Sequence, residues 1–170
     1  VGGQGTVLAS RLIASAYLNQ GKFVRTAETI GMAQRGGCVV SHVRIDSKDK
    51  SSIIPLNTAD LLIAFEPAEA VRCLPRLTDD AALVVNTQTI MPVTASLGGV
   101  AYDENGIISA LKARANIMLI DANALAVEAG SAKAVNVVLL GAAIGAGYLQ
   151  LSLEETTEAL KKMLPEKLHE

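Results

Sequence analysis

Aromatic side chains are scarce in this 170-residue sequence, which has three Tyr, two Phe and no Trp. So few aromatic residues argue against a platform on which nucleic-acid bases could stack. The formal net charge of −2 argues against nucleic acid as a partner too, because phosphate binding normally needs a basic surface. Half of the residues are nevertheless hydrophobic, so the core must be built from Ala, Val, Leu and Ile. That composition suits a parallel sheet buried beneath helices on both faces.

Metal-binding side chains are equally few. Cys38 and Cys73 are the only cysteines, and His42 and His169 are the only histidines. No C-x-x-C or H-E-x-x-H spacing occurs, so this chain alone cannot hold an iron–sulfur cluster or a four-Cys zinc site. Any metal or cluster must therefore come from elsewhere. Two unpaired thiols fit a reducing cytoplasm, and a single disulfide in a secreted protein is the alternative.

One long stretch without charge, residues 134–153, has about the length that crosses a bilayer. Asn136, Gln150 and several glycines interrupt it, so it is expected to form a buried helix in which Asn136 is structural, not a membrane span. A homo-oligomeric scaffold built on this apolar helix stays an alternative. No signal peptide is visible. The sequence begins with Val1 and not with Met, so an N-terminal segment removed by cleavage remains an alternative.

The length is that of one domain, and strand and helix patterns alternate along residues 1–170 without repeats or linkers. The predicted strands are 23–27, 38–45, a short edge strand 53–56, 61–65, 81–85 and 117–120. The predicted helices are 6–20, one that begins at Pro67, 108–114, 137–148 and 152–164, the last capped by Ser152. This alternation predicts an α/β fold, a three-layer α/β/α sandwich with a mostly parallel, Rossmann-like sheet. Because a glycine loop that opens a helix normally follows a strand, we expect the first strand to lie upstream of Val1.

The glycine loop at the start of the chain is the first candidate site. Gly2, Gly3 and Gly5 precede a helix, where backbone amides without neighbouring β-carbons can approach a bound anion. Read as G-x-G-x-x-G, the pattern fits at Gly3 and Gly5 but fails at Leu8, and Glu28 is placed as an acidic ribose partner would be. An independent dinucleotide-binding oxidoreductase is therefore one hypothesis, and a tight strand-to-helix turn without a ligand is the other.

A second glycine-rich loop combines Met32, Gln34, Arg35, Gly36 and Gly37. Arg35 is able to clamp a carboxylate or phosphate through paired hydrogen bonds. The loop therefore reads as a binding or docking loop, and a surface connection with a solvated arginine is the alternative. Met32 would then contact a partner or fill the core.

Two polar residues, Glu66 and Asn86, each follow an apolar strand. Open α/β sheets present polar groups to a ligand crevice from such positions. An acid in the first turn of a helix, favoured by the helix dipole, is the alternative for Glu66. His42 and Arg44 alternate with apolar residues along the predicted strand 38–45, so they are expected to face away from one buried side. No nucleophile–base set can be assembled.

Two long motifs carry a resemblance to a known family. Residues 1–10, VGGQGTVLAS, and 31–45, GMAQRGGCVVSHVRI, resemble the gamma subunit of 2-oxoacid:ferredoxin oxidoreductases, and the second motif is most similar to the indolepyruvate type. Similar stretches at 59–66, 84–87 and 136–141 extend the resemblance over most of the chain.

The resemblance implies an accessory, cytoplasmic subunit of an enzyme complex that oxidatively decarboxylates a 2-oxoacid with coenzyme A, giving an acyl-CoA, carbon dioxide and reduced ferredoxin. It also implies that thiamine diphosphate, magnesium and iron–sulfur clusters belong to partner subunits, and that this chain helps to enclose the reaction chamber. No catalytic residue carries over. The matching residues of the two glycine loops are expected to face a partner subunit or the substrate and coenzyme A path, and the indolepyruvate type suggests an aryl substrate.

Overall fold

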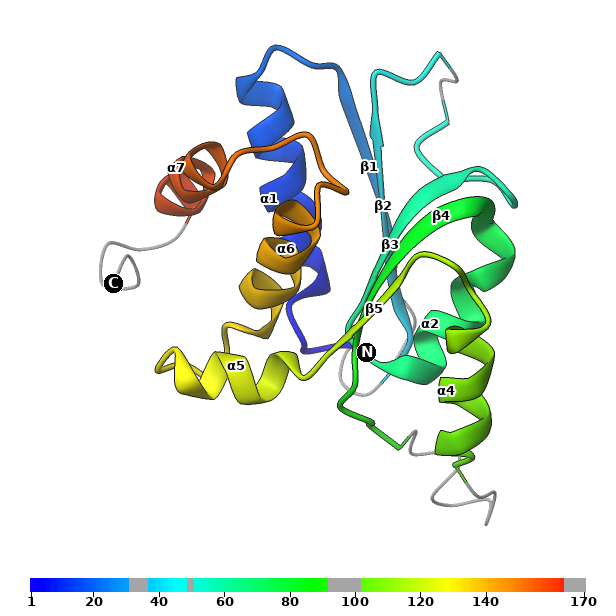
Figure 1. The fold of residues 1–170 in the computed structure, drawn as a ribbon. Coiled ribbons are helices and arrows are strands. Elements are labelled where there is room, and N and C mark those ends of the chain that lie inside the picture. The colour runs from blue at the N-terminus through cyan, green and yellow to red at the C-terminus, as the bar shows by residue number, and fades with distance from the viewer. Residues whose placement is uncertain (31–36, 49–50, 92–101, 164–170) are drawn as a thin grey trace.

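The computed structural model describes residues 1–30, 37–48, 51–91 and 102–163 (Figure 1). Its helices are α1 (Thr6–Asn19), α2 (Pro67–Cys73), the short 3-10 helix η1 (Leu74–Arg76), α4 (Glu104–Lys112), α5 (Ala122–Glu128), α6 (Val135–Gly145) and α7 (Leu153–Met163). Its strands are β1 (Val24–Ile30), β2 (Val39–Ile45), β3 (Ala59–Ala64), β4 (Leu77–Asn86) and β5 (Ile117–Ile120).

A parallel sheet of order β3-β4-β5 lies at the centre of the molecule. Its middle strand is covered on both faces, because successive side chains of a strand point to opposite sides. Leu83 and Val85 pack with Leu111 of α4, whereas Val84 packs with Leu139 of α6 and Ala126 of α5. Figure 1 shows α2 and α4 on one side of this sheet and α1, α5 and α6 on the other. The predicted α/β fold with helices on both faces is confirmed.

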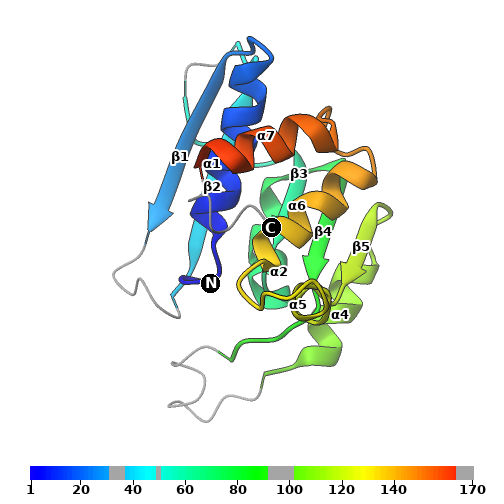
Figure 2. The same ribbon diagram turned by 90° about the vertical axis from the view of Figure 1, so that its left-hand side faces the viewer.

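The strands β1 and β2 form a separate antiparallel pair, with a register that runs from Val24 opposite Ile45 to Ile30 opposite Val39. Figure 2 shows this hairpin beside the parallel sheet. The apolar side of the hairpin packs on α1, where Val43 lies against the cluster that includes Leu12. The described strands therefore form two sheets, the antiparallel pair β1-β2 and the parallel sheet β3-β4-β5 of the predicted fold.

The predicted edge strand 53–56 is wrong, since these residues form no strand. Side chains form hydrogen bonds with backbone groups of this segment that would otherwise pair with a neighbouring strand. Ile54 N–H donates to His42 Nδ1 at 3.3 Å, and Arg76 Nη1 donates to the Ile54 carbonyl at 2.6 Å. Arg44 Nη1 also donates to the Ile53 carbonyl at 3.2 Å. His42 is consequently buried beneath this segment, on the face of β2 that we expected to be free.

A helix that the sequence reading missed, α5, follows β5 directly. Asp121 caps it by accepting a hydrogen bond from Ala124 N at 2.9 Å. Its buried residues are Ala122 and Ala126, which have helical spacing but are small. Its larger apolar residues, Leu125 and Val127, are exposed, so the large apolar residues do not mark the buried face.

The apolar stretch that begins at residue 134 forms the buried helix α6, as predicted. In the part of the chain that the structure describes, no helix combines the length and apolar character needed to cross a membrane. The helix α7 begins directly after Ser152, the predicted cap, and lies beside α1 (Figures 1 and 2).

Candidate functional site

The carboxyl ends of β3 and β4 meet the N-terminal glycine loop at one point, the carbonyl of Phe65 directly after β3. Gln4 Nε2 donates to this carbonyl at 3.1 Å, and Asn86 Nδ2, at the end of β4, donates to it at 3.1 Å. One acceptor oxygen thus connects the loop with two neighbouring strands. The loop sits at the edge where open α/β folds bind their ligands.

Asn86 is fully buried and makes hydrogen bonds with all of its amide groups. Besides its bond to Phe65, its Nδ2 donates to Asn123 Oδ1 at 2.9 Å, and its Oδ1 accepts from Ala122 N at 3.0 Å. These bonds fasten the start of α5 to the ends of β3 and β4. Asn86 therefore positions the edge of the sheet, and its own donors and acceptor are already in use.

Glu66 is buried as well, with 1% of its surface exposed. Its Oε2 accepts from Glu69 N at 3.0 Å and caps α2. Its Oε1 accepts from the Tyr102 hydroxyl and from Ile90 N, the latter at 3.5 Å. Burial, with the donation to Glu66, raises the pKa of the Tyr102 phenol, so this hydroxyl stays a donor at neutral pH. The capping role of Glu66 at the start of a helix is thus the one that the geometry favours.

The glycine loop itself has a backbone that only glycine adopts without strain. Gly3 and Gly5 have φ of 99° and 86°, in the left-handed region. A β-carbon on Gly5 would lie 2.9 Å from Asn136 Nδ2, whereas one on Gly3 would meet nothing within 4 Å. Gly5 therefore serves the close approach of the loop to α6. Gln4 Oε1 is buried without a hydrogen-bond partner among the described residues.

The two glycine loops of the sequence come together in the structure. Gly2 N donates to the Gly37 carbonyl at 2.8 Å, so the start of the chain lies beside the end of the second loop. The predicted site residues Met32, Gln34, Arg35 and Gly36 lie outside the described residues.

Glu28, the proposed ribose partner, lies on β1 opposite Ser41 of β2 and pairs with a cation of α1. Its Oε1 is 3.9 Å from Nε of Arg11, in the middle of α1. A dinucleotide site needs its acidic residue close to the glycine loop at the carboxyl edge of the sheet. The Glu28 carboxylate thus already has a cationic partner on α1, which gives the dinucleotide hypothesis no support.

Both thiols are free and partly buried, and the pKa of each is raised. Burial, with a hydrogen bond to Glu69, raises the pKa of the Cys38 thiol to about 11. Burial also raises the pKa of Cys73. The described residues contain no group of three or more His, Cys, Asp and Glu that could hold a metal ion, so they do not fit an iron–sulfur cluster or a magnesium site.

Sequence reasoning missed Gln4, Tyr102 and Asn123 as members of this edge. Gln4 lies inside the first glycine motif, which was the available signal. Tyr102 contacts Glu66 across 36 positions of the chain, and Asn123 contacts Asn86 across 37. Contacts over such separations leave no local pattern in a sequence.

Comparison with known proteins gives a match over the whole chain. The family model described as pyruvate ferredoxin/flavodoxin oxidoreductase matches residues 1–170. The indolepyruvate oxidoreductase subunit IorB of Archaeoglobus fulgidus is 39% identical over 170 residues, which cover 99% of this chain and 84% of that protein. The common gamma subunit of pyruvate/ketoisovalerate oxidoreductases of Thermococcus kodakarensis is 28% identical over 164 residues, covering 95% and 81%.

Two crystal structures share the fold. The gamma subunit of a keto/oxoacid ferredoxin oxidoreductase from Geobacter sulfurreducens superimposes with a TM-score of 0.65 at 21% identity, covering 99% of this chain and 85% of that one. The pyruvate oxidoreductase subunit PORC of Thermotoga maritima gives a TM-score of 0.66 at 22% identity, covering 99% and 84%.

Proposed function

This chain belongs to the pyruvate ferredoxin/flavodoxin oxidoreductase family, and we propose that it is the accessory subunit of a complex that oxidises a 2-oxoacid. In this reaction the 2-oxoacid is decarboxylated and its acyl group joins coenzyme A, giving an acyl-CoA, carbon dioxide, one proton and two electrons for ferredoxin. The observation that carries the proposal is the similarity over nearly the whole chain to subunits named for such oxidoreductases.

Partner subunits supply the cofactors of the proposed reaction. When bound in those subunits, thiamine diphosphate with magnesium would supply the electron sink for decarboxylation, and iron–sulfur clusters would carry electrons to ferredoxin. A cluster needs four cysteines as a rule, whereas the sequence has two, and both have a raised pKa. This chain therefore contributes binding surface and enclosure to the complex, with coenzyme A held at or near the shared surface.

The proposed substrate is an aryl 2-oxoacid of the indolepyruvate type. The relatives named for indolepyruvate are 35–39% identical to this chain, whereas those named for pyruvate and ketoisovalerate are 26–28% identical. The difference extends over similar lengths of chain, so it supports the aryl substrate.

The two glycine loops are the proposed face toward the partner or the coenzyme path. Gly2, Gly3 and Gly5 lie at the carboxyl edge of the sheet, and Gly37 joins them through the bond to Gly2. Glu66 and Asn86 are buried behind them and hold this edge in place. The residues Met32, Gln34, Arg35 and Gly36 belong to the same proposed face on the strength of the sequence motif.

Purification of the tagged chain from its native source tests the assignment. We expect it to bring down a larger subunit with bound iron, and the complex to reduce viologen only when coenzyme A and an aryl 2-oxoacid are both added. A chain that purifies alone contradicts the assignment, and a complex that prefers pyruvate contradicts the substrate class.

Arg35→Ala tests the second loop within the same complex. Loss of a paired arginine contact is expected to lower the yield of complex or its rate by about tenfold or more, since a hydrogen bond to a charged group contributes about 1.5–3 kcal/mol. Lys133→Ala is the control, because Lys133 is an exposed cation outside both loops. Equal yields and rates for both variants remove Arg35 from the proposed face.

A further inference from the structure

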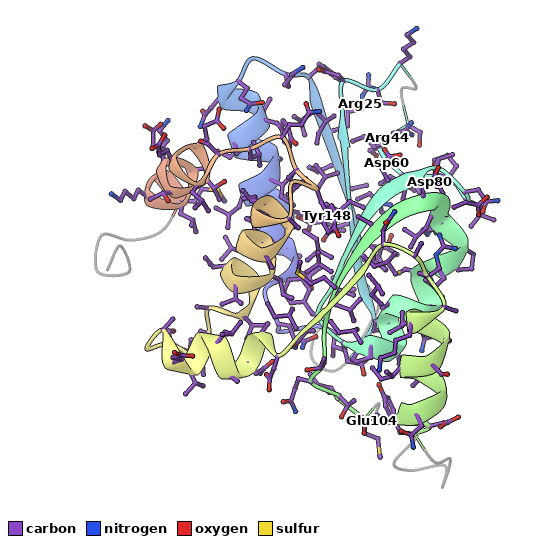
Figure 3. The ribbon with its side chains drawn as sticks, viewed as in Figure 1. Arg25, Arg44, Asp60, Asp80, Glu104 and Tyr148 are labelled. Carbon is purple, nitrogen blue, oxygen red and sulfur yellow. The ribbon has the colours of Figure 1, made fainter. Side chains whose placement is uncertain are left out.

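The sequence contains a single Asn-Gly pair, Asn105-Gly106, and this pair lies in the first turn of α4. Asparagine is chemically labile, and most so before glycine, whose missing β-carbon lets its amide approach the preceding side chain. Asn105 is exposed. Figure 3 shows its neighbour Glu104 at the exposed end of α4. Water therefore reaches the pair.

Asp103 holds the backbone amide that deamidation needs. Its Oδ1 accepts a hydrogen bond from Gly106 N at 2.9 Å and thereby caps α4. Its carbonyl accepts from Ile107 N at 3.0 Å and closes the first helical turn. While both bonds are in place, Gly106 N points at the Asp103 carboxylate and not at the side-chain amide of Asn105.

The same cap accounts for the glycine. Glycine inside a helix is less stable than alanine, so its place in the first turn of α4 has a structural cause. A β-carbon on Gly106 would overlap Oδ2 of Asp103 and lie 2.8 Å from its Cγ. A side chain at position 106 and the capping carboxylate thus compete for the same space. The residue that the cap requires is also the one that makes Asn105 reactive.

The first turn of α5 is a matched reference within the molecule. Asp121 caps it with φ of −80° and ψ of 80°, compared with −81° and 79° at Asp103. Its Oδ1 accepts from Ala124 N at 2.9 Å. Asn123 takes the place of Asn105, but alanine follows it, and its Oδ1 accepts from the side-chain amide at the end of β4. The two turns share the cap and differ at the residues that decide deamidation.

We propose that Asn105 is a site of spontaneous deamidation and that the Asp103 cap sets its rate. When the first turn of α4 opens, Gly106 N attacks Cγ of Asn105 and a cyclic imide forms. The proton of Gly106 N leaves with the side-chain amide as ammonia. Water then opens the ring and gives aspartate or isoaspartate at position 105. The reaction needs no oxidant, and it is independent of the function proposed above.

The two products differ in their effect on α4. Aspartate adds a negative charge at the positive end of the helix dipole and is compatible with the turn. Isoaspartate lengthens the backbone inside the turn, so Gly106 N no longer reaches the capping carboxylate. Glu104 N donates to the Tyr102 carbonyl at 3.0 Å, and the Tyr102 hydroxyl donates to the buried Glu66. Isoaspartate therefore loosens the turn that connects α4 with the edge of the sheet.

Ageing of the folded chain, followed by peptide mass spectrometry, tests the proposal. We expect the peptide that contains Asn105 to gain the mass of deamidation before the peptide that contains Asn123. Asp103→Ala is expected to speed deamidation at Asn105 by about fivefold, because loss of such a cap makes opening of the turn more frequent. Asp103→Asn keeps an acceptor at the cap and should leave the rate nearly unchanged. Circular dichroism checks that both variants are folded.

A second measurement needs neither cap variant. In urea the unfolded chain should deamidate at Asn105 about tenfold faster or more than the folded chain, since the turn no longer has to open. Gly106→Ala should slow the reaction in urea, where the cap is absent. The proposal is overturned if Asn105 reacts no faster than Asn123 in the folded chain. Equal rates in the parent chain and Asp103→Ala, or in folded and unfolded chains, overturn it also.

Discussion

Gly5 meets two separate requirements at the junction between the glycine loop and α1. Its backbone has φ of 86°, which a residue with a β-carbon adopts only with strain. Its missing side chain also leaves room for Asn136 of α6, which lies 2.9 Å from the place of a β-carbon. Gly3 also has a positive φ, but a β-carbon there would meet no other atom within 4 Å. Comparing the two glycines therefore separates the effect of backbone strain from that of packing.

Alanine substitutions at the two positions give a direct prediction. Gly3→Ala is expected to lower the free energy of unfolding by about 1–2 kcal/mol through strain alone. Gly5→Ala is expected to lower it by a further 1–3 kcal/mol or so, because the methyl group overpacks against Asn136. Urea denaturation measures both. In an Asn136→Ala background the cost of Gly5→Ala should fall to that of Gly3→Ala, and equal costs in the parent chain contradict the packing argument.

His42 is held neutral by its surroundings. It is 3% exposed, and its Nδ1 accepts from Ile54 N at 3.3 Å. Burial lowers the pKa of His42, and the nearby Arg76 cation lowers it further. Protonation would place a second cation beside Arg76 and convert the acceptor nitrogen into a donor.

Stability is therefore expected to fall as the pH drops below about 6.5, the ordinary pKa of histidine. Below that pH the unfolded chain binds a proton that the folded chain does not, so the free energy of unfolding decreases by at most about 1.4 kcal/mol per pH unit. Urea denaturation between pH 7.5 and 5.5 measures the slope. This range lies above the titration of Asp46 and Glu155, whose pKa values are lowered by their hydrogen bonds. His42→Asn keeps a hydrogen-bond acceptor and should make the free energy of unfolding nearly independent of pH in this range. An unchanged slope in this variant means that another group causes the pH dependence.

At the scale of elements, α7 depends on a reciprocal pair of hydrogen bonds at its start. Glu155 N donates to Ser152 Oγ at 3.1 Å, and Ser152 N donates to Glu155 Oε2 at 2.7 Å. This capping box satisfies two donors that the helix leaves free. The helix then packs on α1 through Ala159, which is fully buried.

Ser152→Ala is expected to lower the free energy of unfolding by about 1 kcal/mol, the usual effect of losing such a cap. Thr157→Ala is the matched control, because Thr157 is an exposed residue of the same helix whose hydroxyl donates to the Leu153 carbonyl at 2.7 Å. It should change stability by less than about 0.5 kcal/mol. Thermal unfolding measures both, and similar effects in the two variants argue against the capping box.

At the scale of the whole molecule, sequence patterns predict elements well where local chemistry decides them. Pro67 marks the start of α2, and the apolar run 117–120 coincides with β5, as expected. The segment 53–56 was mistaken for a strand because His42 and Arg76 reach it from elsewhere in the chain. The division of the strands into two sheets depends on whether β2 and β3 pair with each other. A local sequence pattern does not predict which strands pair.

At the candidate site, too, the features set by local sequence could be predicted and those set by tertiary contacts could not. Asn86 lies at the end of β4, as the strand pattern predicted, and it donates to the Phe65 carbonyl. The role of Glu66 and Asn86 at a ligand crevice stays a prediction. Their partners could not be predicted, because Tyr102 and Asn123 come from distant parts of the chain. Whether a polar side chain faces a ligand or serves its neighbours depends on these tertiary contacts.

The contact of α1 with the C-terminal part of the chain has a consequence for folding kinetics. Gln150 N donates to the Tyr17 hydroxyl at 2.9 Å across 133 positions, and Gln20 bonds to Glu155 across 135. Such long separations raise the contact order and slow folding. On a ribosome that adds about 5–20 residues per second, α1 waits roughly 7–27 s for the partners that follow it. The hairpin can cover one side of α1 early, but the side that meets α6 and α7 is a natural target for chaperones until those two helices have been synthesised.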